Sequence, residues 1–241
     1  MSAGVVEARI AEAIGHAGAG RRDAAILICE SAAAGQPPHP ALLQLLATLL
    51  LQRGDSARAA EVIAASLALR PDHGPSLLVA GDAARANGSL PAALAHHLRA
   101  CELMAERADA WHALAQTLRA AGRHDEAESA HLRTIALVPG HAPAWFALAL
   151  VRQDRRDVEG AVAALEHLRQ IAPPRAEVEL NLGIVLQEAG RRDEAMRAYG
   201  RALQLDDASF GRIAHALAAP GSGVLWLDLD ALRKHLRAQP A

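Results

Sequence analysis

The chain has 241 residues, of which 51% are hydrophobic and only 2% aromatic, and its formal net charge at neutral pH is −2. This composition favours helices packed through alanine and leucine over a globular core of bulky side chains. With 25 basic and 27 acidic residues, the chain offers no electrostatic case for binding nucleic acid, which needs a concentrated basic face.

The residue usage also indicates where the protein works. Lys234 is the only lysine among many arginines, which together with the alanine excess is typical of a bacterial genome rich in GC. Cys29 and Cys101 are not paired by their spacing, which predicts a reducing compartment. The N-terminus lacks a signal-peptide pattern, and the most apolar run, 42–51, is too short to span a bilayer. We therefore expect a cytoplasmic protein with no membrane partner.

The main pattern in the chain is a 34-residue unit that repeats without gaps. The predicted units are 6–39, 40–73, 74–107, 108–141, 142–175 and 176–209. The fifteenth place of the unit is glycine in five of six cases: Gly20, Gly54, Gly88, Gly122, Arg156 and Gly190. The eighth place is always small: Ala13, Ala47, Gly81, Ala115, Ala149 and Gly183. The twentieth place is always alanine, and proline stands at place 32 in four units. Columns at such fixed offsets identify an internal repeat.

Each column has a physical reason. Glycine adopts the left-handed conformation that closes a helix, so it ends the first helix of the unit. Small residues at places 8 and 20 let two helix backbones approach closely. Proline ends the second helix because it has no N–H to donate. Since one such hairpin cannot bury its own apolar face, the units must stack. The sequence therefore predicts an all-α solenoid of about six helix-turn-helix repeats.

Individual units differ in their expected order. In the first unit Gly15, Gly18 and Gly20 lie close together, which predicts a weakened first helix with a frayed end. The first helix of the second unit, from residue 40 onward, is apolar nearly all round and should be heavily covered. Units three to six alternate apolar and polar residues at helical spacing.

After residue 209 the repeat breaks, and 210–241 is expected to be a C-terminal capping helix, loop and tail. Phe210, Ile213, Ala214 and Leu217 recur at helical spacing, which suits a helix that covers the last exposed face. Residues 220–223 are predicted to form a loop. The alternation over 225–230 favours an extended piece, whereas Asp228 as an N-cap favours a short helix instead. Both interpretations stay open.

The repeat resembles the tetratricopeptide repeat (TPR) family. The family pattern is followed in the fourth unit by Trp111, Leu114, Ala115, Leu118, Gly122, Ala127 and Pro139. It is followed in the fifth unit by Trp145, Leu148, Ala149, Ala161, Leu165 and Pro173, and in the sixth by Leu182, Gly183, Leu186, Gly190, Ala195, Tyr199 and Ala202. This resemblance implies a right-handed α-solenoid whose first helices line a groove that holds a peptide.

The resemblance places that groove at places 2, 5, 6, 9, 12 and 13 of each unit. The predicted peptide-binding residues at these places are Gln44, Thr48, Asp82, Arg85, Asp109, His112, Gln116, Arg119, Phe146, Leu150, Gln153 and Asn181. The basic residues with which some family members hold a C-terminal carboxylate are missing here. A ligand of mixed charge with an apolar segment is therefore expected.

No catalytic signature is present, since the chain has no phosphate loop, serine elbow or recognisable cysteine nucleophile. His97, Cys101 and His131 could supply zinc ligands, but place 24 is a packing position, so we expect no metal and no cofactor. The predicted function is a non-catalytic adaptor for another protein. The alternatives are a recruiting subunit for a separate bacterial transferase or oxygenase, and a self-associating scaffold that forms a homo-oligomer.

Overall fold

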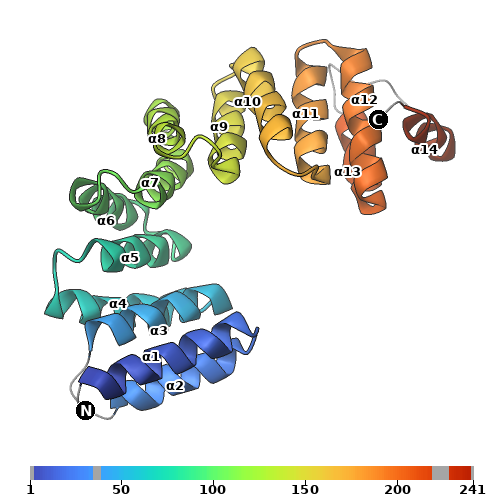
Figure 1. Cartoon of the computed structure of the whole chain (residues 1–241). Helices are drawn as coiled ribbons and strands as arrows, with labels where there is room; N and C mark the ends of the chain where they lie inside the picture. The colour runs from blue at the N-terminus through green and yellow to red at the C-terminus, as the bar shows by residue number, and fades with distance from the viewer. Residues whose placement is uncertain (1–2, 35–38, 219–227, 240–241) are drawn as a thin grey trace. The chain divides into compact units, whose positions relative to one another are not determined.

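The computed structural model describes residues 3–34, 39–218 and 228–239, and all of their regular structure is helical (Figure 1). The first seven helices are α1 (Ala3–Gly18), α2 (Arg22–Ala34), α3 (Pro40–Arg53), α4 (Ser56–Leu69), α5 (Gly74–Ala86), α6 (Leu90–Leu103) and α7 (Ala108–Ala120). The others are α8 (His124–Leu137), α9 (Ala142–Asp154), α10 (Val158–Ile171), α11 (Ala176–Glu188), α12 (Arg192–Leu205), the short 3₁₀ helix η1 (Asp207–Ser209), α13 (Phe210–Leu217) and α14 (Leu229–Arg237). The prediction of an all-α repeat fold is confirmed.

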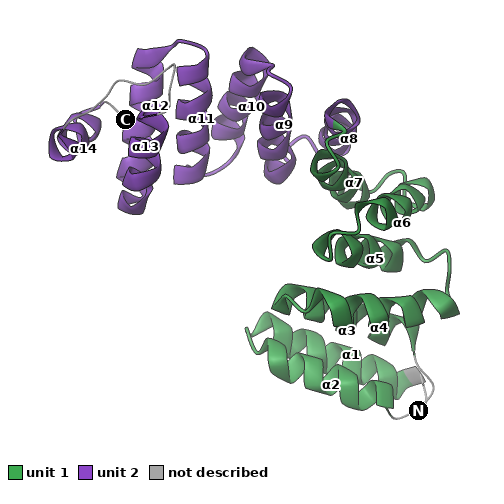
Figure 2. Cartoon of the chain, turned by 180° about the vertical axis from the view of Figure 1, so that it is seen from behind, with its two compact units in different colours: residues 1–123 green, residues 124–241 purple. Residues whose placement is uncertain are grey.

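The chain divides into two compact units, residues 1–123 and 124–241, coloured separately in Figure 2. The first contains α1 to α7 and the second α8 to α14. In the first compact unit α1 packs against α2, α3 against α4 and α5 against α6; in the second, α9 packs against α10 and α11 against α12. The helices α3, α5, α7, α9 and α11 each begin at the first residue of a predicted 34-residue unit. The odd-numbered helices up to α11 are the first helices of the hairpins, and the even-numbered ones up to α12 are the second helices.

The residue at the fifteenth place has a left-handed backbone conformation in all six 34-residue units. The five glycines there have φ between 74° and 90°, and Arg156 has φ 64°. At Gly54 the backbone N–H donates to the carbonyl of Leu51 at 2.9 Å, which closes α3. The turn therefore has the same geometry whether or not the residue is glycine, and only Arg156 bears the steric cost of a β-carbon.

The eighth place brings two helix backbones together, and two repeats need glycine there. A β-carbon on Gly81 would lie 2.3 Å from the ring of His97, and one on Gly183 would lie 2.4 Å from the ring of Tyr199. Both rings are fully buried. A small eighth residue thus makes room for a large one at place 24 of the same hairpin.

The core of the first unit contains the buried face of α3, as its apolar sequence predicts. The prediction of a frayed end on α1 is wrong, because the helix runs through Gly15 to Gly18. Ala13 is fully buried, and Ile10 and Ala17 pack against the same core. This packing outweighs the cost of about 1 kcal/mol for a glycine within a helix.

The second unit ends in two short helices that cover α12 and α11. Ile213 and Leu217 of α13 are buried, as are Leu232 and Leu236 of α14. The Asp228 carboxylate accepts hydrogen bonds from the first backbone N–H groups of α14, so the short-helix interpretation is the observed one. The proline at place 32 of the first 34-residue unit, the predicted loop at 220–223 and the alternating residues 225–227 lie outside the described residues.

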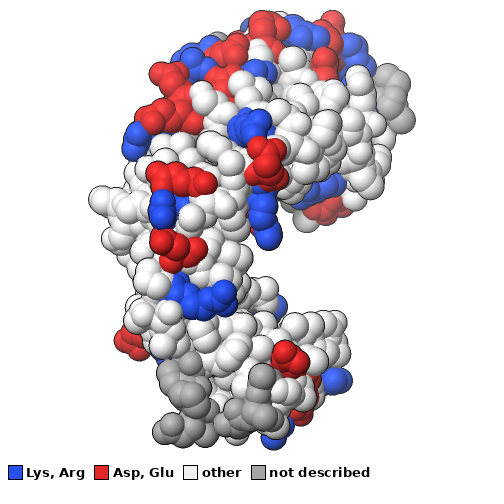
Figure 3. Space-filling model, turned by 60° about the vertical axis from the view of Figure 1, so that its left-hand side comes forward, with Lys and Arg blue, Asp and Glu red and all other residues white. Residues whose placement is uncertain are grey.

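Surface charge is mixed on the face drawn in Figure 3, where acidic and basic side chains lie next to one another. In the described segments, no helix has the length and apolar character that crossing a bilayer requires.

Candidate functional site

The twelve predicted binding residues all lie on first helices of hairpins. Gln44 and Thr48 are on α3, Asp82 and Arg85 on α5, and Asp109, His112, Gln116 and Arg119 on α7, in the first compact unit. Phe146, Leu150 and Gln153 are on α9, and Asn181 is on α11, in the second unit. Eleven of them are half-buried and Asp109 is exposed. Each unit therefore carries its own portion of the predicted binding face.

In the first unit these side chains form short-range polar pairs along each helix. The Arg85 guanidinium donates to the Asp82 carboxylate at 3.1 Å. The Gln116 amide lies 2.9 Å from Nε2 of His112, one turn away. Such pairs at a solvated surface contribute little to stability. They can therefore be exchanged for contacts with a ligand.

Two further predicted residues, Asp109 and Thr48, have partners close to them in the sequence. The Asp109 carboxylate lies 2.6 Å from a guanidinium nitrogen of Arg107, and this hydrogen bond lowers the pKa of Asp109. The Thr48 hydroxyl donates to the carbonyl of Gln44 at 2.9 Å, within α3.

The second compact unit (residues 124–241) contains a pocket of about 460 Å³ bounded by α11, α12 and α13. Its apolar wall includes Leu180 and Ile184, which lie one turn apart on α11. The complete lining is Leu180, Ile184, Gln187, Glu188, Tyr199, Gly211, Arg212, His215 and Ala216. The pocket thus combines an apolar interior with side chains of both charges and a histidine.

Local sequence explains why α13 contributes polar groups to this pocket. Ile213 and Leu217, four residues apart, face the core and are buried. Arg212 and His215 lie on other faces of the same two turns and are exposed. The helix that covers the last hairpin therefore also supplies the charged rim of the pocket.

A hydrogen-bond chain ties the three helices together at the pocket. The Tyr199 hydroxyl of α12 donates to Oε1 of Gln187 on α11 at 3.0 Å, and Nε2 of Gln187 donates to the carbonyl of Ala216 on α13 at 3.0 Å. Burial raises the pKa of Tyr199, and the nearby charge of Glu188 raises it further. Tyr199 therefore stays a neutral donor, and the pocket wall is fixed before any ligand binds.

None of the twelve predicted residues lines this pocket, although Gln153 reaches its rim. The Gln153 amide on α9 donates to the Glu188 carboxylate at 3.0 Å. Phe146 packs against the core of the second compact unit. The Asn181 amide donates a hydrogen bond to the carbonyl of Glu177 on the same helix. The twelve residues stay predicted contacts.

A sequence signal for the pocket did exist. Leu180 and Ile184 occupy places 5 and 9 of the sixth unit, where the repeat pattern locates groove residues. The helical spacing at 210–217 marked the neighbouring wall. The orientation of α13 about its own axis could not be predicted from the sequence. This orientation places Arg212 and His215 at the border of the pocket.

His97 and Cys101, two of the three residues considered as zinc ligands, are explained by packing in the first compact unit. His97 is fully buried, its Nδ1 lies 2.9 Å from the Thr117 hydroxyl, and burial lowers its pKa. Burial raises the pKa of the Cys101 thiol to about 12, which disfavours the thiolate that zinc needs. Over the described ranges, no three His, Cys, Asp or Glu side chains are placed to hold a metal ion.

Hairpins of two helices, a left-handed turn at a fixed place and small residues at the contact define the class of helical-hairpin repeat proteins. Models of the tetratricopeptide repeat match residues 16–80, 108–151 and 180–212. The chain belongs to the tetratricopeptide repeat family.

Solved structures of similar fold agree with this assignment. The chain superposes on pilF of Pseudomonas aeruginosa with a TM-score of 0.71 and 18% identity, covering 97% of each chain. MamA of Desulfovibrio magneticus RS-1 gives a TM-score of 0.64 and 16% identity, over 70% of this chain and 96% of that one. YrrB, described as a TPR protein with an unusual peptide-binding site, gives 0.61 and 17%, over 73% and 90%. No curated protein matches the chain in sequence.

Proposed function

We propose that the protein is a non-catalytic adaptor that binds a segment of a partner protein along its first-helix faces. The pocket between α11 and α13 would take an apolar side chain of that segment. The observation that most supports this proposal is the pocket, which is concave, largely apolar and bordered by a few polar groups. Its volume of about 460 Å³ lies within the range of ordinary ligand sites.

The polar rim supports a ligand of mixed charge. Arg212 offers a cation, Glu188 an anion, and His215 a group that can donate or accept. Since the hydrogen-bond chain through Tyr199 and Gln187 already joins the three helices, little ordering is needed when a peptide binds. Such preorganisation improves affinity by lowering the entropic cost of association. That YrrB is described as peptide-binding is consistent with this use of the fold.

The test begins with a peptide selected from a displayed library on the purified full chain, with its dissociation constant measured by fluorescence anisotropy. Ile184→Gln places an amide in the apolar wall and should raise the constant at least tenfold. The matched control is Ile171→Gln on α10, since Ile171 is a second-helix residue that is 39% exposed. Circular dichroism should show unchanged helix content for both variants.

Two outcomes would overturn the proposal. One is a selected peptide that binds both variants as tightly as the original protein. The other is a library that yields no peptide at all.

The first unit can be tested with the same peptide. Arg119→Glu reverses a charge on α7, and weaker binding would show that the segment also contacts the first unit. Unchanged binding would restrict the site to α9, α11 and α13, with the proposed pocket still in place.

A further inference from the structure

A second candidate site lies between the second helices α10 and α12, away from the first-helix faces of the proposed function. Two adjoining hollows of about 280 and 370 Å³ are both lined by Arg169 of α10 and Arg201 of α12. Arg197 lines the smaller hollow, whereas Pro174 and Leu205 line the larger one. The hollows thus place guanidinium groups beside a short apolar wall.

The carboxylates at these hollows already have partners. Glu194 lies 2.6 Å from Arg191, and Glu166 lies 3.9 Å from the same guanidinium. Glu179, whose side chain is only 4% exposed, is held by Arg201 at 2.8 Å. Each of these carboxylates therefore already has an arginine within 4 Å, and Glu166 and Glu194 share the one guanidinium of Arg191.

Two arginines are left over. Within the described part of the chain, neither Arg169 nor Arg197 has an ion pair or a side-chain hydrogen bond, although each lines the smaller hollow. A guanidinium carries five N–H donors in a planar fork that matches a carboxylate or a phosphate. Bonds between such charged partners are stronger than neutral ones. The hydrogen bond from Arg191 lowers the pKa of the nearby Glu194 carboxyl, and the charge of Arg197 helps to lower it. The N–H donors of Arg169 and Arg197 make no hydrogen bond with the described residues, so they are available to an oxyanion that those residues do not supply.

The surroundings favour a carboxylate over a phosphate. Glu166, Glu179 and Glu194 stand around the hollows, and their charges oppose a dianion more than a monoanion. Pro174 and Leu205 offer carbon surface next to the arginines, and Leu205 is 46% exposed. A glutamate next to an apolar residue in a peptide has both features, whereas inorganic phosphate has only the charge.

We propose that Arg169 and Arg197 form a binding site for the carboxylate of an acidic peptide segment, with a neighbouring apolar side chain of that segment resting on Pro174 and Leu205. This site is on second helices and is independent of the proposed first-helix binding face. An adaptor with both sites would hold two segments at once, which raises the overall affinity for a partner that carries both.

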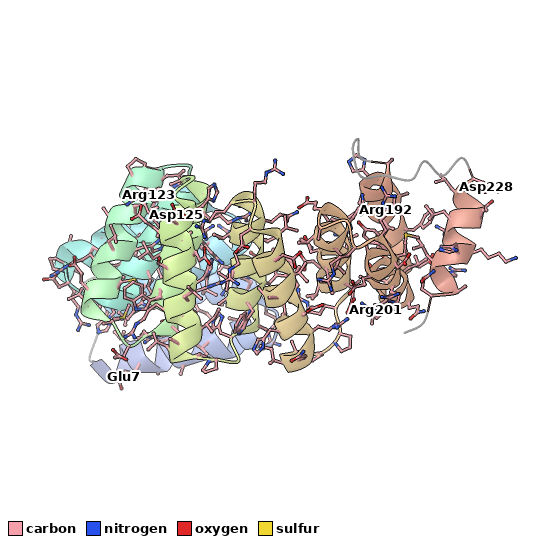
Figure 4. All side chains as sticks on the ribbon, turned by 90° about the horizontal axis from the view of Figure 1, so that it is seen from above. Glu7, Arg123, Asp125, Arg192, Arg201 and Asp228 are labelled. Atoms are coloured by element: carbon pink, nitrogen blue, oxygen red, sulfur yellow. The ribbon has the colours of Figure 1, made fainter. Side chains whose placement is uncertain are left out.

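The experiment uses the isotope-labelled full chain, titrated with N-acetyl-leucyl-glutamyl amide and followed by NMR through the arginine side-chain N–H signals. The uncharged comparison is the glutaminyl peptide, and inorganic phosphate and sodium chloride at matched ionic strength complete the set. The variants are Arg169→Gln and Arg197→Gln. Arg192→Gln is the matched control, because Arg192 lies at the opposite end of α12 from Arg201 (Figure 4).

The expected result is a saturable shift with the glutamyl peptide, with a dissociation constant at least tenfold higher in each of the two site variants and unchanged in Arg192→Gln. Neither the glutaminyl peptide nor sodium chloride should reproduce the shift. Equal shifts with the glutamyl and glutaminyl peptides would overturn the proposal, as would an equal loss in Arg192→Gln. Binding of phosphate without binding of the glutamyl peptide would replace the carboxylate assignment. The outcome is separate from the Ile184→Gln test, since the two sites share no residue.

Discussion

Arg156 occupies the one hairpin turn in which the chain does not use glycine, and its replacement tests the account of the repeat. Its φ of 64° lies in the left-handed region that five glycines adopt at the equivalent place. Its side chain is exposed and makes no hydrogen bond or ion pair with the described residues. Arg156→Gly therefore removes backbone strain and no side-chain contact.

The size of the effect follows from two opposing terms. A left-handed conformation costs a non-glycine residue about 1–2 kcal/mol. Replacement by glycine relieves this strain, but about 0.4–1 kcal/mol of the gain is lost because glycine increases the conformational entropy of the unfolded chain. The variant should therefore be more stable by about 0.5–1 kcal/mol, which corresponds to a rise of about 1–4 °C in Tm for a chain of this length.

Thermal unfolding of the full chain measures this, with urea unfolding as a second probe. Arg156→Asn should also stabilise, because asparagine tolerates the left-handed region without adding backbone freedom. Arg156→Val should destabilise, because a β-branched residue does not. If the glycine variant unfolded at a lower temperature than the original protein, the turn would not be the strained element described here.

Three more predictions concern packing and charge. Gly183→Ala should destabilise by up to about 2 kcal/mol, since its β-carbon overlaps the Tyr199 ring and overpacking outweighs the gain in helix propensity. Combined with Tyr199→Leu it should cost less than the sum of the two single variants, and additive losses in urea unfolding would argue against the overlap. Burial lowers the pKa of His97 below 6.5, so the unfolded chain binds more protons in acid and stability falls as the pH drops below 6.5. His97→Leu should flatten that part of the pH profile of Tm, and an identical profile would remove His97 as its cause. Arg201→Met leaves the buried Glu179 carboxylate unpaired and should lower the free energy of unfolding by about 3 kcal/mol. Adding Glu179→Gln should recover most of this loss. If it does not, the loss comes from packing of the arginine stem.

The repeat was predictable because its determinants are local. A glycine that closes a helix and a small residue that admits a neighbouring ring act within one 34-residue unit, so each leaves a column in the sequence. The same logic accounts for the error at α1, where Gly15 suggested weakness on propensity alone. Contacts of Val6, Ile10 and Ala13 with the following hairpins decide the outcome there, and no local pattern reports them.

The two proposed binding sites were less predictable because they combine residues from several helices. The pocket at Ile184 depends on how α13 is rotated, and that helix lies beyond the last full repeat. The proposed arginine site depends on which carboxylates are already paired. Arg169 and Arg191 look alike in the sequence, yet Arg191 lies beside Glu194 and Glu166, whereas Arg169 has no ion pair with a described residue. Pairing across hairpins is a property of the folded chain.

The proposed function requires that the pocket bounded by α11, α12 and α13 holds the apolar part of the segment selected from the library. The test is NMR mapping of the selected peptide on the full chain. Saturating peptide should shift the backbone and methyl signals of Leu180, Ile184 and Ala216 and leave those of Ile171 unmoved. Shifts confined to α10 and α12, with the signals of Ile184 unchanged, would contradict it.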